Sequence, residues 1–337
     1  MRSTKSPSWI SRLAGLGPLP APPHAFALDG ERLQYGCFVA AGDGFAFREY
    51  HREEIPPETF QRAPLGSLLK DPTALDATLG RLVERLAAPV KQASLTLPDA
   101  WLRVAFTESA ELPPAARERD EVLRWKLKRL VPFRVDELRI DAVEVAPLPG
   151  QQEPRRLLLG FAVEAFLAQL EAAFRRAGTH LGRITSTSLA LLAALDEPPG
   201  GDALTALVLA EGSSGAAGAE GSGYTLAVAR DGEMLLHRYK GLPAALAESA
   251  RGDFVRRDLA LTRNFLAENV PAAPLGRAVL AAAAASEPAW LGWLEDGLGA
   301  RAEALGPGHL PPVAGADSGV DWGELAPMLG VVRQEIA

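Results

Sequence analysis

The chain has 337 residues, and its 35 basic and 42 acidic side chains give a formal net charge of −7. This balance argues against nucleic acid as the main partner, because phosphate binding requires a basic surface. Hydrophobic residues at 47% and charged residues at 23% exclude wholesale disorder, while a single cysteine and five scattered histidines exclude a disulfide scaffold and argue against a metal site.

Residues 1–23 are expected to form a flexible N-terminal tail. Trp9, Ile10 and Leu13 fall near helical spacing, but the glycine and prolines that follow stop any helix. The tail lacks the continuous apolar region of a secretory signal, and no apolar run approaches the roughly 18 residues of a membrane span. A cytoplasmic protein is therefore expected. The alternative for the tail is a short amphipathic segment that touches a membrane or a partner.

The next part of the chain predicts a three-strand meander followed by a helix and a further strand. Asp29-Gly30 and Gly42-Asp43-Gly44 are typical of tight turns between strands. Asp71 is suited to cap a helix, and Pro72 to occupy its first position. The expected elements are strands at 25–28, 33–39 and 45–50, a helix that begins at Asp71-Pro72 and ends before Pro89, and a strand at 91–97.

An α+β unit is expected to be inserted into the first half of the chain, over residues 92–178. Leu102, Val104 and Phe106 alternate with less apolar neighbours, as in a strand with one buried face. The further elements of this unit are helices at 115–131 and 164–177 and strands at 138–145 and 157–161. A strand at 181–185, a helix at 187–195 and a hinge at Pro198-Pro199-Gly200-Gly201 follow.

The opening pattern returns after this hinge. Strands are expected at 203–210, 223–230 and 233–239, followed by a helix, a strand at 278–282 and a helix at 288–297. A meander followed by a helix therefore occurs once in each half. Two such halves predict an α/β fold of two lobes around a nucleotide cleft, with a first lobe at 24–200 and a second at 201–337.

The glycine-rich run from Gly212 to Gly223, between two expected strands, could bind phosphate through backbone N–H groups. Asp29 could also hold Mg²⁺ through water, and Glu211 could position a water molecule. A plain Asp-Gly turn, a surface carboxylate and a solvent-exposed hairpin tip are the alternatives. The chain has no nucleophile motif, so no catalytic residue is predicted. The candidate nucleotide-binding residues are Asp29, Gly30, Glu211, Gly212, Ser213 and Ser214.

A basic segment with one aromatic residue lies at 124–130. Asp120 can pair with Arg124 one helical turn later, and Lys128 falls on the same face as Arg124. This segment is either a solvated helix face or a face that binds another protein.

The stretch from Glu121 to Leu138 (EVLRWKLKRLVPFRVDEL), preceded by Leu112-Pro113-Pro114, resembles the type IV pilus assembly protein PilM family. In that family a helix with acidic residues at its start runs into a Pro-Phe segment and a pair of acids, here Asp136-Glu137. The order of elements also matches over about 25–331. The resemblance implies an actin-like (ribonuclease H-like) fold related to FtsA, with the insert at 92–178 in that family's distinctive position.

The chain departs from the family where ATP is expected. The first phosphate loop lacks the family's serines and lysine, and the second carries a long insert. Ala281–Ala285 stand where glycines usually let the backbone approach a nucleotide, and their methyl groups would crowd it. The region around 242–270 is too short for the family's full small subdomain. The expectation is an actin-like protein with weak or lost ATP and Mg²⁺ binding, and no enzymatic activity.

The function implied by the resemblance is that of a cytoplasmic scaffold, peripheral to the inner membrane, in the assembly platform of a pilus or a related secretion machine. It would bind the cytoplasmic N-terminal peptide of a PilN-like membrane protein, contact other platform proteins and could form a homo-oligomer. The expected partner-binding residues are Arg124, Trp125, Lys128 and Phe133. The alternatives are an active actin-like ATPase of the same machinery and a cytoplasmic component of a type II secretion platform.

Overall fold

A computed structural model of the chain describes residues 21–63, 66–109, 111–131, 134–145, 147–148, 154–196, 203–211, 223–230, 232–243, 246–270, 273–316 and 320–333. The predicted tail (except its last three residues) and the predicted hinge lie outside these residues, as do Phe133, Gly212, Ser213 and Ser214. Within the described part of the chain, no helix is long and apolar enough to cross a membrane.

The first lobe is built on a six-stranded sheet in the order β10-β6-β1-β2-β3-β16. The predicted opening meander forms its centre, because β1 pairs antiparallel with β2 and β2 with β3. The other strands join in parallel, since the chain returns to this sheet after long excursions. The strands are β1 (His24–Leu28), β2 (Arg32–Ala41), β3 (Gly44–Glu54), β6 (Gln92–Leu97), β10 (His180–Ser186) and β16 (Val313–Ala314).

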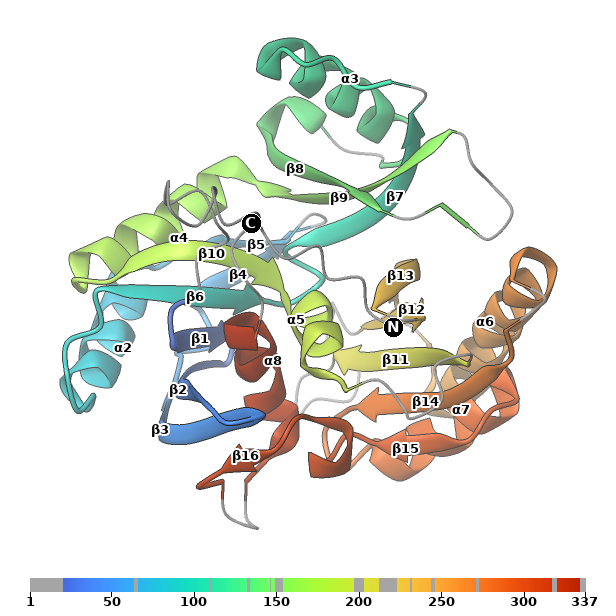
Figure 1. Cartoon of the computed structure of the whole chain (residues 1–337). Coiled ribbons are helices and arrows are strands. Elements are labelled where there is room, and N and C mark those ends of the chain that lie inside the picture. The colour runs from blue at the N-terminus through green and yellow to red at the C-terminus, as the bar shows by residue number, and fades with distance from the viewer. Residues whose placement is uncertain are drawn as a thin grey trace.

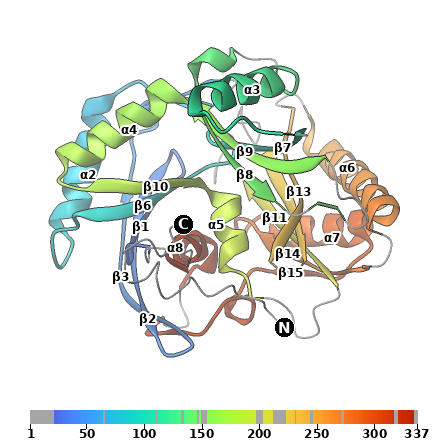
Figure 2. The same cartoon turned by 45° about the horizontal axis from the view of Figure 1, so that its top comes forward.

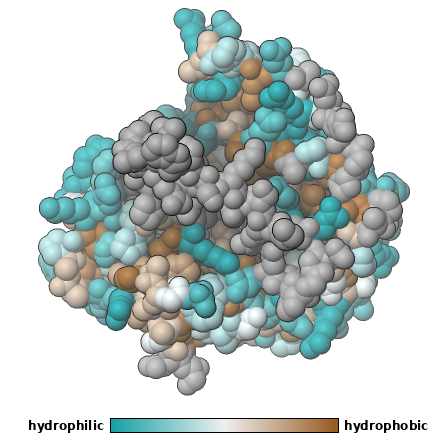
Figure 3. Space-filling view, viewed as in Figure 1, coloured by the Kyte–Doolittle hydropathy of each residue, from teal (hydrophilic) through white to brown (hydrophobic). Residues whose placement is uncertain are grey.

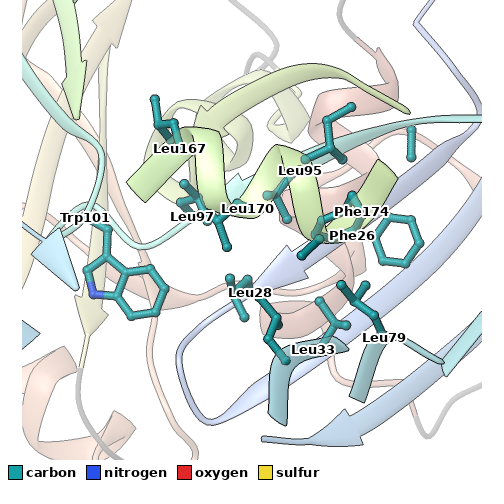
Figure 4. Packing of buried hydrophobic residues seen from close by; sticks show 14 of the residues in the cluster. Phe26, Leu28, Leu33, Leu79, Leu95, Leu97, Trp101, Leu167, Leu170 and Phe174 are labelled. Carbon is teal, nitrogen blue, oxygen red and sulfur yellow. The ribbon is translucent and has the colours of Figure 1, made fainter. Parts of the chain in front are cut away.

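Helices α2 (Pro72–Glu84) and α4 (Glu164–Arg176) pack against each other beside this sheet (Figure 1). As predicted, α2 begins with a cap: the Asp71 carboxylate accepts hydrogen bonds from the backbone N–H groups of Thr73 and Ala74, both at 3.0 Å. In the core below these helices, the rings of Phe26 and Phe174 pack edge to face, with their centroids 5.0 Å apart (Figure 4). A short hairpin of β4 (Phe60–Ala63) and β5 (Gly66–Leu69), which the sequence did not predict, lies before α2.

The second lobe is built on a five-stranded sheet in the order β13-β12-β11-β14-β15. Its first three strands are the predicted second meander, and α6 and α7 pack together beside it. Between these helices and the sheet, the buried rings of Tyr224 and Trp290 lie 5.5 Å apart. The elements are β11 (Leu204–Glu211), β12 (Gly223–Arg230), β13 (Glu233–Gly241), α6 (Glu248–Asn269), β14 (Leu275–Ala281), α7 (Glu287–Leu298) and β15 (Ala302–Ala304).

Two helices, α5 (Thr187–Ala194) and α8 (Trp322–Arg333), cross each other between the two sheets (Figure 1). Gly330 is required at their contact, because a Cβ atom added there would lie 1.8 Å from the carbonyl oxygen of Ala190. Arg333 closes the crossing by donating to the carbonyl oxygens of Ala194 and Leu195 at 3.0 and 3.2 Å. The sequence did not predict α8, although it forms the middle of the molecule.

A separate three-stranded sheet in the order β7-β9-β8 stands above the lobes and carries α3 (Figure 2). It extends over residues 103–163, whereas the predicted insert covers 92–178. The difference arises because β6 and α4 belong to the first lobe, and a strand's apolar pattern does not reveal which sheet it joins. The elements are β7 (Arg103–Ser109), α3 (Ala116–Lys128), the 3₁₀ turn η1 (Val135–Glu137), β8 (Leu138–Val145) and β9 (Arg155–Val163).

Candidate functional site

The first predicted phosphate turn lies between β1 and β2, and its acidic residue is engaged within the turn. One oxygen of Asp29 accepts the backbone N–H groups of Glu31 and Arg32 at 2.9 and 2.7 Å, and the other accepts Nε of Arg32 at 3.0 Å. Arg32 also pairs with Glu324 of α8, with 2.5 Å between Nη1 and Oε1. Asp29 therefore fixes the turn and links it, through Arg32, to the central helix.

Gly30 has a left-handed backbone, with φ of +92°, which a residue with a side chain adopts only under strain. A Cβ atom at this position would lie 2.9 Å from Cζ2 of Trp101. The indole is buried and packs against the rings of Phe60 and Phe166, whose centroids lie 5.0 and 5.4 Å from its own. One side of the predicted phosphate turn is therefore covered by an aromatic ring.

Glu211, the residue at the end of β11, reaches from the second lobe to the first. Its Oε1 accepts the backbone N–H of Asp99 at 2.6 Å. Burial, reinforced by the negative charge of Asp99, raises the pKa of Glu211 to about 8. The protonated carboxyl group is then favoured at neutral pH, and a protonated carboxyl group is a poor ligand for Mg²⁺.

A second buried contact between the lobes joins Asp99, Ser188 and His237. Asp99 accepts the backbone N–H of Ser188 at 3.0 Å and also its hydroxyl group. Nε2 of His237, on β13, lies 2.7 Å from the same hydroxyl oxygen and 3.5 Å from Oδ1 of Asp99. The side chains of His237 and Asp99 are both 0% exposed.

These three residue types also form hydrolase triads, but the arrangement here is different. In a triad the acid contacts Nδ1 of the histidine, whereas here the acid contacts the serine, and Nδ1 of His237 has no hydrogen-bond partner among the described residues. The buried side chains also offer no access to a substrate. The cluster therefore fits a structural role, that of holding the lobes together. Sequence reasoning missed it because its members come from three separate segments.

The three-stranded sheet makes further contacts with the second lobe, because β7 lies beside β13 (Figure 2). The guanidinium group of Arg103 stacks 4.2 Å from the ring centroid of Tyr239 on β13. Arg156, on β9, is buried and donates from Nη2 to the carbonyl oxygen of Leu235 at 2.8 Å. The lobes are thus joined through α5 and α8, through the Asp99 cluster and through this sheet.

Three of the predicted partner-binding residues, Arg124, Trp125 and Lys128, lie on α3, which is at a distance from β1 and β11 (Figure 1). Trp125 is 58% exposed, and the guanidinium group of Arg129 lies 5.3 Å from its ring centroid. Lys128 is exposed beside it, and apolar surface shows among hydrophilic residues in this region, at the top of Figure 3. Arg124 is engaged instead: its Nε donates to Asp120 at 2.7 Å, and its Nη1 donates to the carbonyl oxygen of Val135.

No protein-family model and no curated protein sequence matches the chain. Among solved structures, the chain resembles the PilM-PilN type IV pilus biogenesis complex, with a TM-score of 0.67 and 16% identity over 94% of this chain and 97% of that chain. It is also similar to a Bacteroides thetaiotaomicron protein with an actin-like ATPase fold and unknown function, with a TM-score of 0.48 and 8% identity over 91% and 96% of the two chains. A third match is the cytoplasmic domain of EpsL, an inner-membrane component of the type II secretion system of Vibrio cholerae, with a TM-score of 0.44, 10% identity and 92% coverage of both chains.

The likeness to the PilM-PilN structure identifies the class of fold: the protein has the actin-like ATPase fold, as predicted. Within that class, its fold is PilM-like along nearly the whole length of both chains, which confirms the resemblance inferred from residues 112–138.

Proposed function

We propose that this chain is a non-catalytic scaffold in the assembly platform of a type IV pilus or a related secretion machine. On this proposal it lies at the cytoplasmic face of the inner membrane and binds the N-terminal peptide of a PilN-like membrane protein. The support comes from the PilM-like fold, which extends over 97% of the PilM-PilN neighbour. The site residues are proposed below from this chain's own contacts.

The proposal that ATP binding is weak or lost rests on one observation above all. Glu211 bridges the lobes at the end of β11, where a phosphate or Mg²⁺ would have to be held, and its carboxyl group is occupied by the backbone of Asp99. Asp29 and Gly30 on the opposite turn are likewise engaged, by Arg32 and Trp101 respectively. A nucleotide would need to break these contacts before it gained any of its own.

Two surfaces of the three-stranded sheet could hold an extended peptide. The first is the exposed face of α3 with Trp125 and Lys128, whose charge suits an acidic or carbonyl-rich segment. The second is strand β8, which pairs only with β9 among the described strands and exposes Val143 by 55%. An unpaired edge can add one more strand from a partner. We propose the α3 face as the site of the peptide, and strand β8 is the alternative outcome of the test.

Titration calorimetry of the full chain with a synthetic peptide tests this function. The peptide is the cytoplasmic N-terminus of the PilN-like protein encoded in the same genome. Lys128→Glu together with Trp125→Ala should weaken binding about tenfold or more, because the change removes an aromatic contact and reverses a charge. Lys91→Glu, an exposed residue in the first lobe, serves as the matched control and should leave affinity unchanged.

Absence of binding to the wild-type chain overturns the partner assignment. Unchanged affinity in the folded α3 variant moves the site to β8, where Val143→Pro would then be the variant to test.

A further inference from the structure

The outer face of α6 carries large apolar side chains that the described chain leaves exposed. Leu261 is 60% exposed and Phe265 is 37% exposed, and their spacing of four residues places them one above the other. Phe254, Arg257 and Glu268 continue the same line, since steps of three and four residues stay on one face of a helix. We call Phe254, Arg257, Leu261, Phe265 and Glu268 the α6 stripe.

A pocket of about 360 Å³ opens beside this stripe, between α6 and β13. Its walls include Leu246, Phe254 and Leu261, and its cations are Lys240 and Arg257. Its volume is at the lower end of the range of small-ligand sites, and it could also receive one large apolar side chain. The pocket and the exposed apolar pair therefore form one continuous surface.

The charges along the stripe are arranged so that they complement each other between two copies. Asp253 and Asp258 at the pocket are already matched, by Arg256 at 2.5 Å and Arg238 at 2.7 Å. In contrast, no ion pair joins Arg257 or Glu268 to any of the residues that the structure describes. A cation thus stands toward the N-terminal side of the apolar pair, and an anion toward its C-terminal side.

We infer that the α6 stripe is where a second copy of this chain docks, with the two helices antiparallel across a two-fold axis near residue 263. Two midpoints along the sequence of α6 nearly coincide. The midpoint of Leu261 and Phe265 falls within one residue of the midpoint of Arg257 and Glu268. A single axis therefore places Leu261 against Phe265 of the second copy and Arg257 against its Glu268, and the reverse pairs form at the same time. Phe265 of each copy then lies against Leu261 at the rim of the other's pocket.

A different partner would need a matching pattern of its own, whereas the second copy supplies both the apolar and the charged complement from the same helix. The length of α6, 22 residues or about 33 Å, allows both pairs to form in one contact.

Sedimentation equilibrium of the full chain alone, from about 1 to 100 μM, tests this inference without any peptide. The wild type should dimerise, and Leu261→Glu should remain monomeric. Arg257→Glu and Glu268→Arg should each raise the dissociation constant about tenfold or more, because each creates two like-charged contacts. The double variant should restore wild-type association, since both pairs reappear with reversed sign.

Leu130→Glu, at a leucine that is 49% exposed just after the end of α3, is the control and should dimerise like the wild type. Circular dichroism melts check that every variant is folded. The substitutions on α6 are at exposed helix positions, where glutamate and arginine are well tolerated. A monomeric wild type, a dimer that survives Leu261→Glu, or a double charge reversal that does not restore association overturns the inference.

Discussion

The contact of Glu211 with Asp99 predicts how stability depends on pH. Burial raises the pKa of Glu211 from its ordinary value of 4.5 to about 8 in the folded protein. The folded state therefore holds this proton more tightly than the unfolded state does. Its stabilising effect is fully present below the unfolded pKa, falls as pH rises between these two values, and is lost above the folded pKa.

The size of the effect follows from the same shift. One pKa unit corresponds to about 1.4 kcal/mol, so the free energy of unfolding should fall by a few kcal/mol across this window. Glu211→Gln keeps a carbonyl oxygen that can accept the N–H of Asp99 but cannot ionise. Relative to the wild type, the variant should gain stability steadily between about pH 5 and pH 8, and the difference should level off above that.

The measurement is urea unfolding, followed by circular dichroism at several pH values in this range. Glu84→Gln provides a control, because Glu84 is exposed at the end of α2 and its curve should run parallel to that of the wild type. If Glu211→Gln also runs parallel to the wild type, the side chain is ionised in the folded protein and the reasoning about the cleft is wrong.

ATP with Mg²⁺ should leave the melting temperature unchanged. A functional ATP site would raise the free energy of unfolding by about 2.7 kcal/mol at a hundredfold excess of ligand over Kd. A melting temperature that rises with ATP concentration would favour the ATPase alternative. Arg124→Glu should lower the free energy of unfolding in urea by about 1–3 kcal/mol, because the carbonyl oxygen of Val135 loses its hydrogen-bond donor. Lys128→Glu should stay within about 0.5 kcal/mol of the wild type. Equal effects of the two substitutions would show that Arg124 is free. Gly330→Ala should lower the melting temperature, because the new methyl group would clash with the backbone of Ala190. Gly80→Ala on α2 should raise the melting temperature, because no atom lies within 4 Å of the new methyl group. An unchanged melting temperature for Gly330→Ala would contradict the close crossing of α5 and α8.

Local signals account for what could be predicted about the fold. The two meanders rest on alternation within single strands, and the start of α2 rests on Asp71 and Pro72, which act on neighbouring backbone groups. Helix α8 was missed although the Asp321 carboxylate accepts the backbone N–H of Gly323 at 2.9 Å at its start, because the residues that follow do not show a helical pattern. Pro327 is normally a helix breaker, and residues 325–331 are all buried, so no polar face marks the segment as helical.

The sequence by itself determined most of the elements, their order and a PilM-like pattern at 112–138, because each depends on residues close together in the chain. Only the tertiary structure decided that Glu211 contacts Asp99 and that Arg124 holds η1. It also decided that Leu261 and Phe265 remain uncovered on α6. Burial, charge and hydrogen-bond partners at these positions are set by segments far away in sequence, and no local pattern specifies which distant group a side chain will meet.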